Sequence, residues 1–162
     1  RLSKEKGQDM IPNVLLRLIR DGYNIKWYCI GDGELREEIN DKIKLNKLDN
    51  NLILLGTKSN PYRYMSECNI YVQPSIYEAY CITVAEARCF NKPIIVTNFT
   101  GADEQIINCK TGYIVNRDEE ELYKKIKVLL DSNEIMREFQ LNLEKESFNT
   151  YGELKKIDKL FD

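Results

Sequence analysis

The sequence contains no histidine, and this absence removes several kinds of catalytic site. A Ser/His triad, a Cys/His zinc site and an imidazole general base all require that side chain. The cysteines are odd in number and show no CxxC spacing, which is typical of a reducing compartment; they are Cys29, Cys68, Cys81, Cys89 and Cys109. Any chemistry carried by this chain must therefore use carboxylates, amines, hydroxyls or backbone groups.

Net charge and long apolar runs are also scarce. The chain sets Lys+Arg 24 against Asp+Glu 26, a balance that gives no electrostatic reason to bind nucleic acid. No apolar run approaches the roughly 20 residues that span a bilayer, and the opening "RLSKEKG" is not followed by an apolar signal segment. We therefore expect a cytoplasmic protein without a nucleic-acid partner, whose 162 residues form one packed domain.

Apolar residues follow two spacings along the chain. Helical spacing predicts helices at 10–19, 34–43, 61–68, 81–91 and 103–108, and three closing helices from 118 to the end; short apolar runs predict strands at 25–30, 51–56, 69–75, 92–98 and 112–115. This alternation is typical of an α/β fold, a Rossmann-like parallel sheet with helices on both faces. The closing helices have no strand between them, so we expect residues 132–162 to form a helical extension of the domain built by residues 1–131.

Loops at the carboxyl ends of parallel strands are where such folds bind ligands. The stretch "PSIYEAYCITVAEA" (74–87) follows one predicted strand and carries two carboxylates, Glu78 and Glu86, among apolar residues. Glu78 would lie in the loop and Glu86 about one turn inside the next helix, where a carboxylate can accept the hydroxyl protons of a ribose or hexose. The alternative is that Glu78 caps the helix and Glu86 pairs with Arg88 or a surface lysine.

Two cations, Arg1 and Lys6, bracket another loop that Gly7 closes. Cations near a helix N-terminus oppose the helix dipole unless an anion is bound between them, so these residues indicate an anion site; solvated surface charge is the alternative. The turn "GDG" (31–33) lacks the third glycine of a dinucleotide fingerprint, because Arg36 stands there. That departure disfavours NAD binding by this route.

Taken together, these stretches resemble the C-terminal donor-binding domain of GT-B fold retaining glycosyltransferases of family 4, also called glycosyl transferases group 1. That family carries G-R-L-x-x-x-K-G, a G-x-G turn, a strand ending in L-G, P-S-x-x-E-G-F-G-x-x-x-x-E-A and P-[IV]-[IV]-x-[ST]-x-x-x-G. The corresponding stretches here are "RLSKEKG", "GDGELREEI", "LILLG", "PSIYEAYCITVAEA" and "KPIIVTNFTGADEQI", followed by "TGYIV". They occur in the family's order over residues 1 to about 131.

The resemblance implies a nucleotide-sugar site with Glu78 as the catalytic residue that contacts the transferred sugar. The implied donor-binding residues are Arg1 and Lys6 for the diphosphate, Glu86 for the ribose hydroxyls, Gly56 and Thr57 along the base, Gly31 in the first turn, and the amides near Tyr80, Cys81 and Ile82 for phosphate or sugar. The donor would be a UDP or GDP sugar. No metal or other cofactor is expected, since helix amides and two cations would stabilise the leaving diphosphate.

Two features differ from the family pattern. The family's E-G-F-G is "EAYC" here, and the β-carbon of Cys81 would narrow the donor pocket or move the donor slightly. The chain also opens at "RLSKEKG" without a preceding strand and lacks the family's N-terminal acceptor-binding domain. We therefore expect a piece of a longer enzyme, whose partners are the nucleotide-sugar donor, that N-terminal domain, and a glycan or lipid-linked acceptor at the inner face of a membrane.

Two other functions stay open on the sequence. A sugar-nucleotide epimerase of the same GT-B architecture would use acid/base residues that this segment lacks. A non-catalytic α/β signalling domain, such as a phosphoacceptor module, would need clustered aspartates after its first strand, where this chain has basic residues.

Overall fold

The computed structural model describes the backbone of residues 1–158 and the side chains of residues 1–146. The strands in this part of the chain are β1 (Trp27–Ile30), β2 (Leu52–Gly56), β3 (Tyr71–Gln73), β4 (Ile94–Thr97) and β5 (Gly112–Val115). Each ladder is parallel: β1 pairs with β2, and β4 lies between β3 and β5. The predicted α/β class is confirmed. The strands form a two-stranded and a three-stranded sheet, because no ladder joins β1 to β3 in the described residues.

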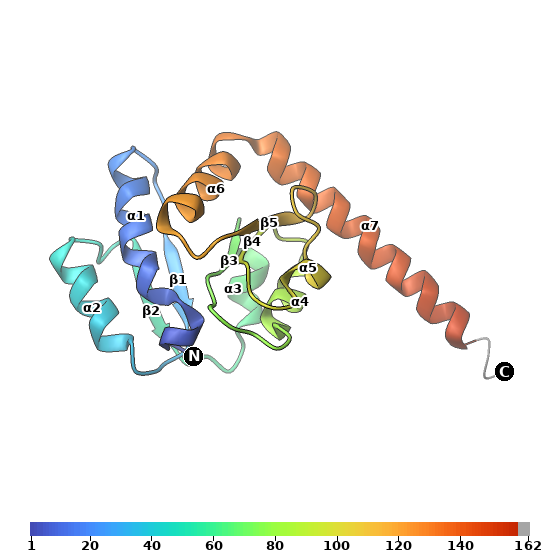
Figure 1. Cartoon of the computed structure of the whole chain (residues 1–162), viewed down its shortest axis with the longest axis horizontal. Coiled ribbons are helices and arrows are strands. Elements are labelled where there is room, and N and C mark those ends of the chain that lie inside the picture. Colours follow the sequence, from blue (N-terminus) through green and yellow to red (C-terminus); the bar gives the residue numbers. More distant parts are fainter. Residues whose placement is uncertain (159–162) are drawn as a thin grey trace.

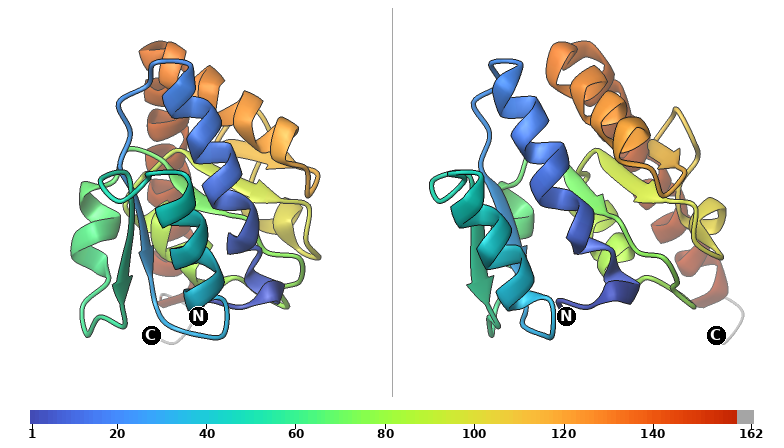
Figure 2. Two further views of the ribbon diagram at one scale, coloured as in Figure 1. Left: turned by 90° about the vertical axis from the view of Figure 1, so that its left-hand side faces the viewer. Right: turned by 60° about the vertical axis from the view of Figure 1, so that its left-hand side comes forward.

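Helices cover both faces of these sheets (Figure 1). The helical elements are η1 (Lys4–Lys6), η2 (Gln8–Met10), α1 (Ile11–Arg20), α2 (Arg36–Leu45), α3 (Tyr62–Glu67), α4 (Ile82–Cys89), α5 (Ala102–Gln105), α6 (Glu119–Asp131) and α7 (Asn133–Asp158). Figure 2 shows α2, α1 and α6 side by side in one layer, and α1 contacts both of its neighbours. The predicted order of helices and strands is confirmed from α1 to α6.

The strand β4 is buried on both faces and shows why the domain has two helical layers. Side chains of a strand alternate between its faces. Ile95 packs in a cluster with α1 and α6, whereas Ile94 and Val96 pack in another cluster with α4 and α5. A third cluster joins α1 and α2 to β1 and β2. The apolar run that predicted this strand is therefore explained by burial on both sides.

Residues 1–8, here called the bridging segment, connect the two sheets at the carboxyl ends of their strands. The backbone N–H of Leu2 donates to the carbonyl of Asp32 in the turn after β1, at 3.0 Å. The backbone N–H of Ile76, in the loop after β3, donates to the carbonyl of Glu5 at 2.7 Å. One short segment is thus hydrogen-bonded to a loop of each sheet.

Glycine is required where the bridging segment lies against the loop after β3. Gly7 has φ 68°, in the left-handed region, and a β-carbon added there would lie 1.8 Å from the carbonyl oxygen of Pro74. That distance is far below any non-bonded contact, so another residue fits only if the backbone moves. Gly33 is similar, with an added β-carbon 2.2 Å from the carbonyl oxygen of Leu2.

Between residue 118 and residue 158, where the description of the chain ends, there are two helices, α6 and α7, and the expectation of three was wrong. Helix α7 continues through Gly152, because a glycine in a helix interior costs only about 1 kcal/mol relative to alanine and does not by itself end a helix. Its first half packs on the body of the domain through Phe139 and Leu143, which are 1% and 2% exposed. The side chains predicted to form a third apolar stripe, Leu154, Ile157 and Leu160, lie outside the described residues. None of the described helices combines the length and apolar character needed to cross a membrane.

Candidate functional site

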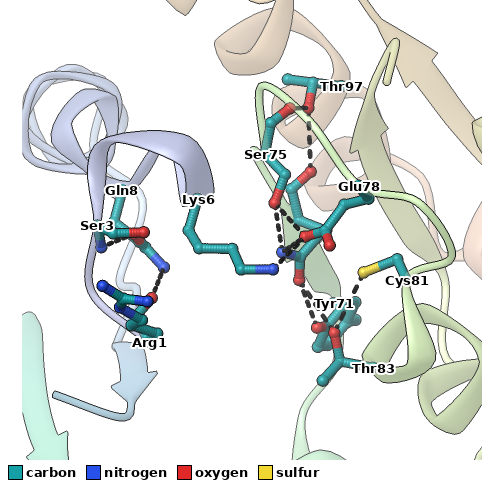
Figure 3. Close-up of polar contacts among 11 residues, drawn as sticks. Arg1, Ser3, Lys6, Gln8, Tyr71, Ser75, Glu78, Cys81, Thr83 and Thr97 are labelled. Carbon is teal, nitrogen blue, oxygen red and sulfur yellow. Dashed lines mark hydrogen bonds and ion pairs between the residues drawn. The ribbon is translucent and has the colours of Figure 1, made fainter. Parts of the chain in front are cut away.

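Lys6 and Glu78 meet at the carboxyl ends of the strands. Lys6 extends from the bridging segment toward the loop after β3, and its Nζ donates to Glu78 Oε1 at 2.7 Å (Figure 3). The Glu78 side chain is about one-tenth exposed and that of Lys6 about one-third. Two residues that lie 72 positions apart in the sequence therefore form a partly buried ion pair.

Glu78 is held by further donors from the end of β3. Ser75 Oγ donates to Glu78 Oε1 at 2.7 Å, and Gln73 Nε2 donates to the same oxygen at 3.3 Å. The Gln73 amide is itself oriented, because its Oε1 accepts from Tyr71 OH at 2.7 Å and from Thr83 Oγ1 at 3.3 Å. The Cys81 thiol is a further hydrogen-bonding neighbour of the Glu78 carboxylate. The network therefore fixes the Oε1 atom of the carboxylate.

The protonation of Glu78 follows from these contacts. Burial raises the pKa of the Glu78 carboxyl, but the hydrogen bond and charge of Lys6 and the hydrogen bond of Ser75 lower it more. The resulting pKa lies below the ordinary value for a glutamate. Glu78 is therefore ionised at neutral pH and can accept a hydrogen bond or stabilise positive charge, but it cannot act as a general acid there.

The residues between Glu78 and the start of α4 form another part of the candidate site. Helix α4 begins at Ile82, and no side chain caps it; the alternative that Glu78 is its cap is therefore wrong. Cys81 is buried and its Sγ lies 3.3 Å from Thr83 Oγ1, whereas Tyr80 and Ile82 are exposed. Burial raises the pKa of the Cys81 thiol, so it stays protonated at neutral pH.

Glu86 lies farther along α4 and has a partner that the sequence did not indicate. The hydroxyl of Tyr62, the first residue of α3, donates to Glu86 Oε1 at 3.0 Å. Arg88 does not pair with Glu86, as the alternative required, but with Glu146 of α7 at 2.9 Å. No lysine forms an ion pair with Glu86 among the described residues, so its contact is with a neutral donor.

The remaining predicted site residues lie beside the two-stranded sheet. The Gly31 N–H donates to the Gly56 carbonyl at 2.9 Å, which brings the ends of β1 and β2 together, and Thr57 follows as an exposed residue. The backbone nitrogen of Arg1 lies 3.0 Å from where a β-carbon on Gly31 would be. The Arg1 side chain is exposed and forms no ion pair with a described residue.

Two residues of the site were missed at the sequence level and one was present in a motif without a role. Gln73 and Tyr62 are not among the predicted site residues, and Ser75 belongs to the P-S stretch but has no predicted role. A polar glutamine that ends an apolar strand is a signal that could have indicated Gln73. Nothing in the sequence around Tyr62 indicated its contact with Glu86.

The described residues offer no cluster of metal-ligating side chains at the site. The described residues contain no group of three or more Asp, Glu, Cys or His side chains that could hold a metal ion. A cavity of about 440 Å³ lies between α2 and β2, and residues such as Arg36 and Leu54 line it. None of its lining residues is a predicted site residue.

Comparison with known proteins agrees with the fold. The model of the family "Glycosyl transferases group 1" matches residues 1–146. The capsular polysaccharide biosynthesis glycosyltransferase CapM of Staphylococcus aureus is 31% identical over 140 residues, which cover 85% of this chain and 37% of CapM.

Two solved structures with low sequence identity show the same fold. A crystal structure of S. aureus TarM with UDP matches with a TM-score of 0.85 and 23% identity, covering 100% of this chain and 34% of that one. The C-terminal domain of the glycosyl transferase group 1 protein LpcC from Francisella tularensis matches with a TM-score of 0.83 and 19% identity, covering 93% of this chain and 82% of that one.

The chain spans between 25% and 38% of the length of the first three curated relatives that it matches, all of which are glycosyltransferases. The family match extends from the bridging segment to α7, and so includes every predicted site residue. This chain belongs to the glycosyl transferases group 1 family, with the GT-B type of α/β fold.

Proposed function

We propose that this chain is the donor-binding half of a retaining glycosyltransferase of family 4, which transfers a sugar from a UDP or GDP sugar to a glycan or lipid-linked acceptor. The observation that carries the proposal is the 2.7 Å contact of Lys6 with Glu78 at the carboxyl ends of the strands. A cation suited to a diphosphate and a carboxylate suited to a sugar hydroxyl lie side by side. The UDP in the related TarM structure supports a nucleotide-diphosphate ligand.

Lys6 can bind the diphosphate and keep its hydrogen bond to Glu78. An ammonium group carries three donors, and one of them is used in the contact with Glu78 Oε1. The remaining donors would bind phosphate oxygens, and Arg1 of the same segment would add a second cation. The N–H groups in the first turn of α4, which no side chain caps, would contribute to the stabilisation of the leaving diphosphate.

Glu78 would act on the sugar. Its carboxylate is ionised at neutral pH and its Oε1 is fixed by Lys6 and Ser75, so Oε2 would accept a hydrogen bond from a sugar hydroxyl. The negative charge would also stabilise the positive charge that develops at the anomeric carbon as the bond to the diphosphate breaks. These groups together supply charge stabilisation, and the reaction as proposed requires no metal ion.

The acceptor would bind to a second domain. The relatives are much longer than this chain, which leaves room for an N-terminal acceptor-binding domain in the full-length protein. Correct placement of two reactants can supply roughly 7–11 kcal/mol of a barrier. We therefore expect no measurable sugar transfer by residues 1–162 alone, and transfer once that domain is present in the same chain.

Calorimetric titration of the chain with UDP, GDP and uridine tests the donor-binding half of the proposal. We expect UDP or GDP to bind and uridine to bind much more weakly. Added salt should lower the affinity for the diphosphate. Lys6→Ala should remove most of the difference between UDP and uridine. Lys4→Ala is the matched control, because Lys4 is an exposed lysine of the same short helix.

Two results would decide against the proposal. The absence of binding by both UDP and GDP would remove the donor site. Assay of the full-length protein with nucleotide sugars should give a glycosylated acceptor, and an epimerised nucleotide sugar in its place would show a different reaction.

A further inference from the structure

Tyr62 is the one residue in the described part of the chain that connects α3 to the Glu86 carboxylate through a hydrogen bond. It begins α3, five residues after Thr57, and reaches across to the middle of α4. The loop after β2 and helix α4 belong to different sheets of the fold. The contact therefore links the start of α3, which follows the loop proposed to lie along the base, with the carboxylate proposed to hold the ribose.

Two further contacts position Tyr62, one made by its ring and one by its backbone. Its ring packs against that of Phe90, at the end of α4, with 6.2 Å between the ring centroids. Its backbone N–H donates to Asn60 Oδ1 at 3.1 Å, which orders the start of α3. The side chain is nevertheless about half exposed, so a ligand at this edge can reach it.

The polarity of the contact determines which atoms remain for a ligand. The hydrogen bond to Glu86 raises the pKa of the Tyr62 phenol, so Tyr62 remains a donor at neutral pH. Glu86 Oε1 is thereby occupied, and no hydrogen bond to Glu86 Oε2 is found among the described residues. A carboxylate with one fixed and one available oxygen has a defined orientation toward an incoming hydroxyl group.

We propose that Tyr62 is a positioning residue of the nucleoside site, whose hydroxyl orients the Glu86 carboxylate toward the ribose hydroxyls of the donor. The inference rests on the proposed function, since it requires that Glu86 binds a ribose. It assigns to Tyr62 a role that acts through Glu86 and not through contact with the reacting sugar.

Tyr62→Phe removes the hydroxyl and keeps the ring that packs on Phe90. Tyr28→Phe is a closely matched control, because Tyr28 is 47% exposed like Tyr62 and also lies in a tilted ring pair, with Tyr64 at 6.4 Å. The hydroxyl of Tyr28 forms no hydrogen bond with any residue that the structure describes. The free energies of unfolding of both variants, measured with urea, show whether either change disturbs the fold.

Calorimetry with UDP and with 2′-deoxyuridine diphosphate supplies a readout that a purely structural role would not move. The parent chain should prefer UDP, because Glu86 has two ribose hydroxyls to bind. Tyr62→Phe should lower the affinity for UDP about five- to tenfold, as expected when a charge-assisted contact is misaligned. It should lower the affinity for the deoxy compound less. The preference for UDP should therefore shrink in Tyr62→Phe and stay unchanged in Tyr28→Phe.

Each other result counts against the inference in a recognisable way. If the parent binds UDP and Tyr62→Phe keeps the same affinity and the same preference, Tyr62 has no positioning role. Equal weakening of both nucleotides, or a parent that does not prefer UDP, would likewise overturn it. A parent that binds neither nucleotide would overturn the proposed function itself, and the inference with it.

Discussion

Substitution of Gly7 by alanine tests the bridging segment most directly. The new β-carbon would lie 1.8 Å from the carbonyl oxygen of Pro74, and the residue has φ 68°. The left-handed conformation costs a non-glycine residue about 1–2 kcal/mol. Relief of the overlap by backbone movement adds about 1–3 kcal/mol, as for other overpacked positions. We therefore expect Gly7→Ala to lower the free energy of unfolding by about 2–5 kcal/mol in total.

Gly22→Ala separates the two contributions. Gly22 also has a positive φ, of 92°, but a β-carbon added there would have no neighbour within 4 Å. Its cost should be the backbone contribution alone, about 1–2 kcal/mol. Urea unfolding of both variants, followed by circular dichroism, measures the difference. Equal losses in the two variants would show that the bridging segment does not lie against Pro74 and would refute the reasoning.

Three further predictions concern the site and the core. Glu86→Ala should weaken the binding of UDP by about 1.5–3 kcal/mol in calorimetry. Glu78→Ala should leave the affinity for UDP nearly unchanged and reduce sugar transfer by the full-length protein. Equal losses of UDP affinity would contradict the two roles. Because the folded-state pKa of Glu78 is lowered, its contribution to stability is present above the unfolded value of about 4.3 and is lost as the pH falls through the folded value. Lys6→Ala should reduce that acid dependence of the urea midpoint, and an unchanged pH profile would argue against the ion pair. Phe139→Ala should lower the free energy of unfolding by about 3–5 kcal/mol, because Phe139 is buried. Leu141 is about half exposed, so Leu141→Ala should have only a small effect. Similar losses in the two variants would show that α7 is not part of the core.

The fold could largely be predicted from the sequence because its signals are local. The run that forms β4 is apolar at every position, and α1 repeats its apolar residues at helical spacing; both patterns follow from burial. The end of a helix is a weaker signal, since a single glycine such as Gly152 does not stop one. That is why α7 was predicted as two helices.

The site could be predicted only in part, because its contacts join distant segments. The motifs indicated Lys6 and Glu78 as site residues, but not that Gln73 and Ser75 hold the carboxylate between them. The pairing of Tyr62 with Glu86 depends on how α3 packs beside α4, which no periodicity encodes. The sequence therefore indicated which residue types are present, and tertiary packing determines which oxygen atoms remain available.

The position of the bridging segment gives ligand binding a mechanical consequence. Lys6 belongs to that segment and Glu78 to the loop of the three-stranded sheet, so a ligand that contacts both would act as an additional cross-link between the sheets. By mass action, a ligand at 100 times its Kd stabilises the bound form by about 2.7 kcal/mol. Local opening at this junction would be suppressed to the same degree. The Ile76 amide donates a hydrogen bond to the Glu5 carbonyl, so it would exchange its hydrogen more slowly when a donor is bound. The exchange rate of this amide would therefore report how much of the protein has ligand bound.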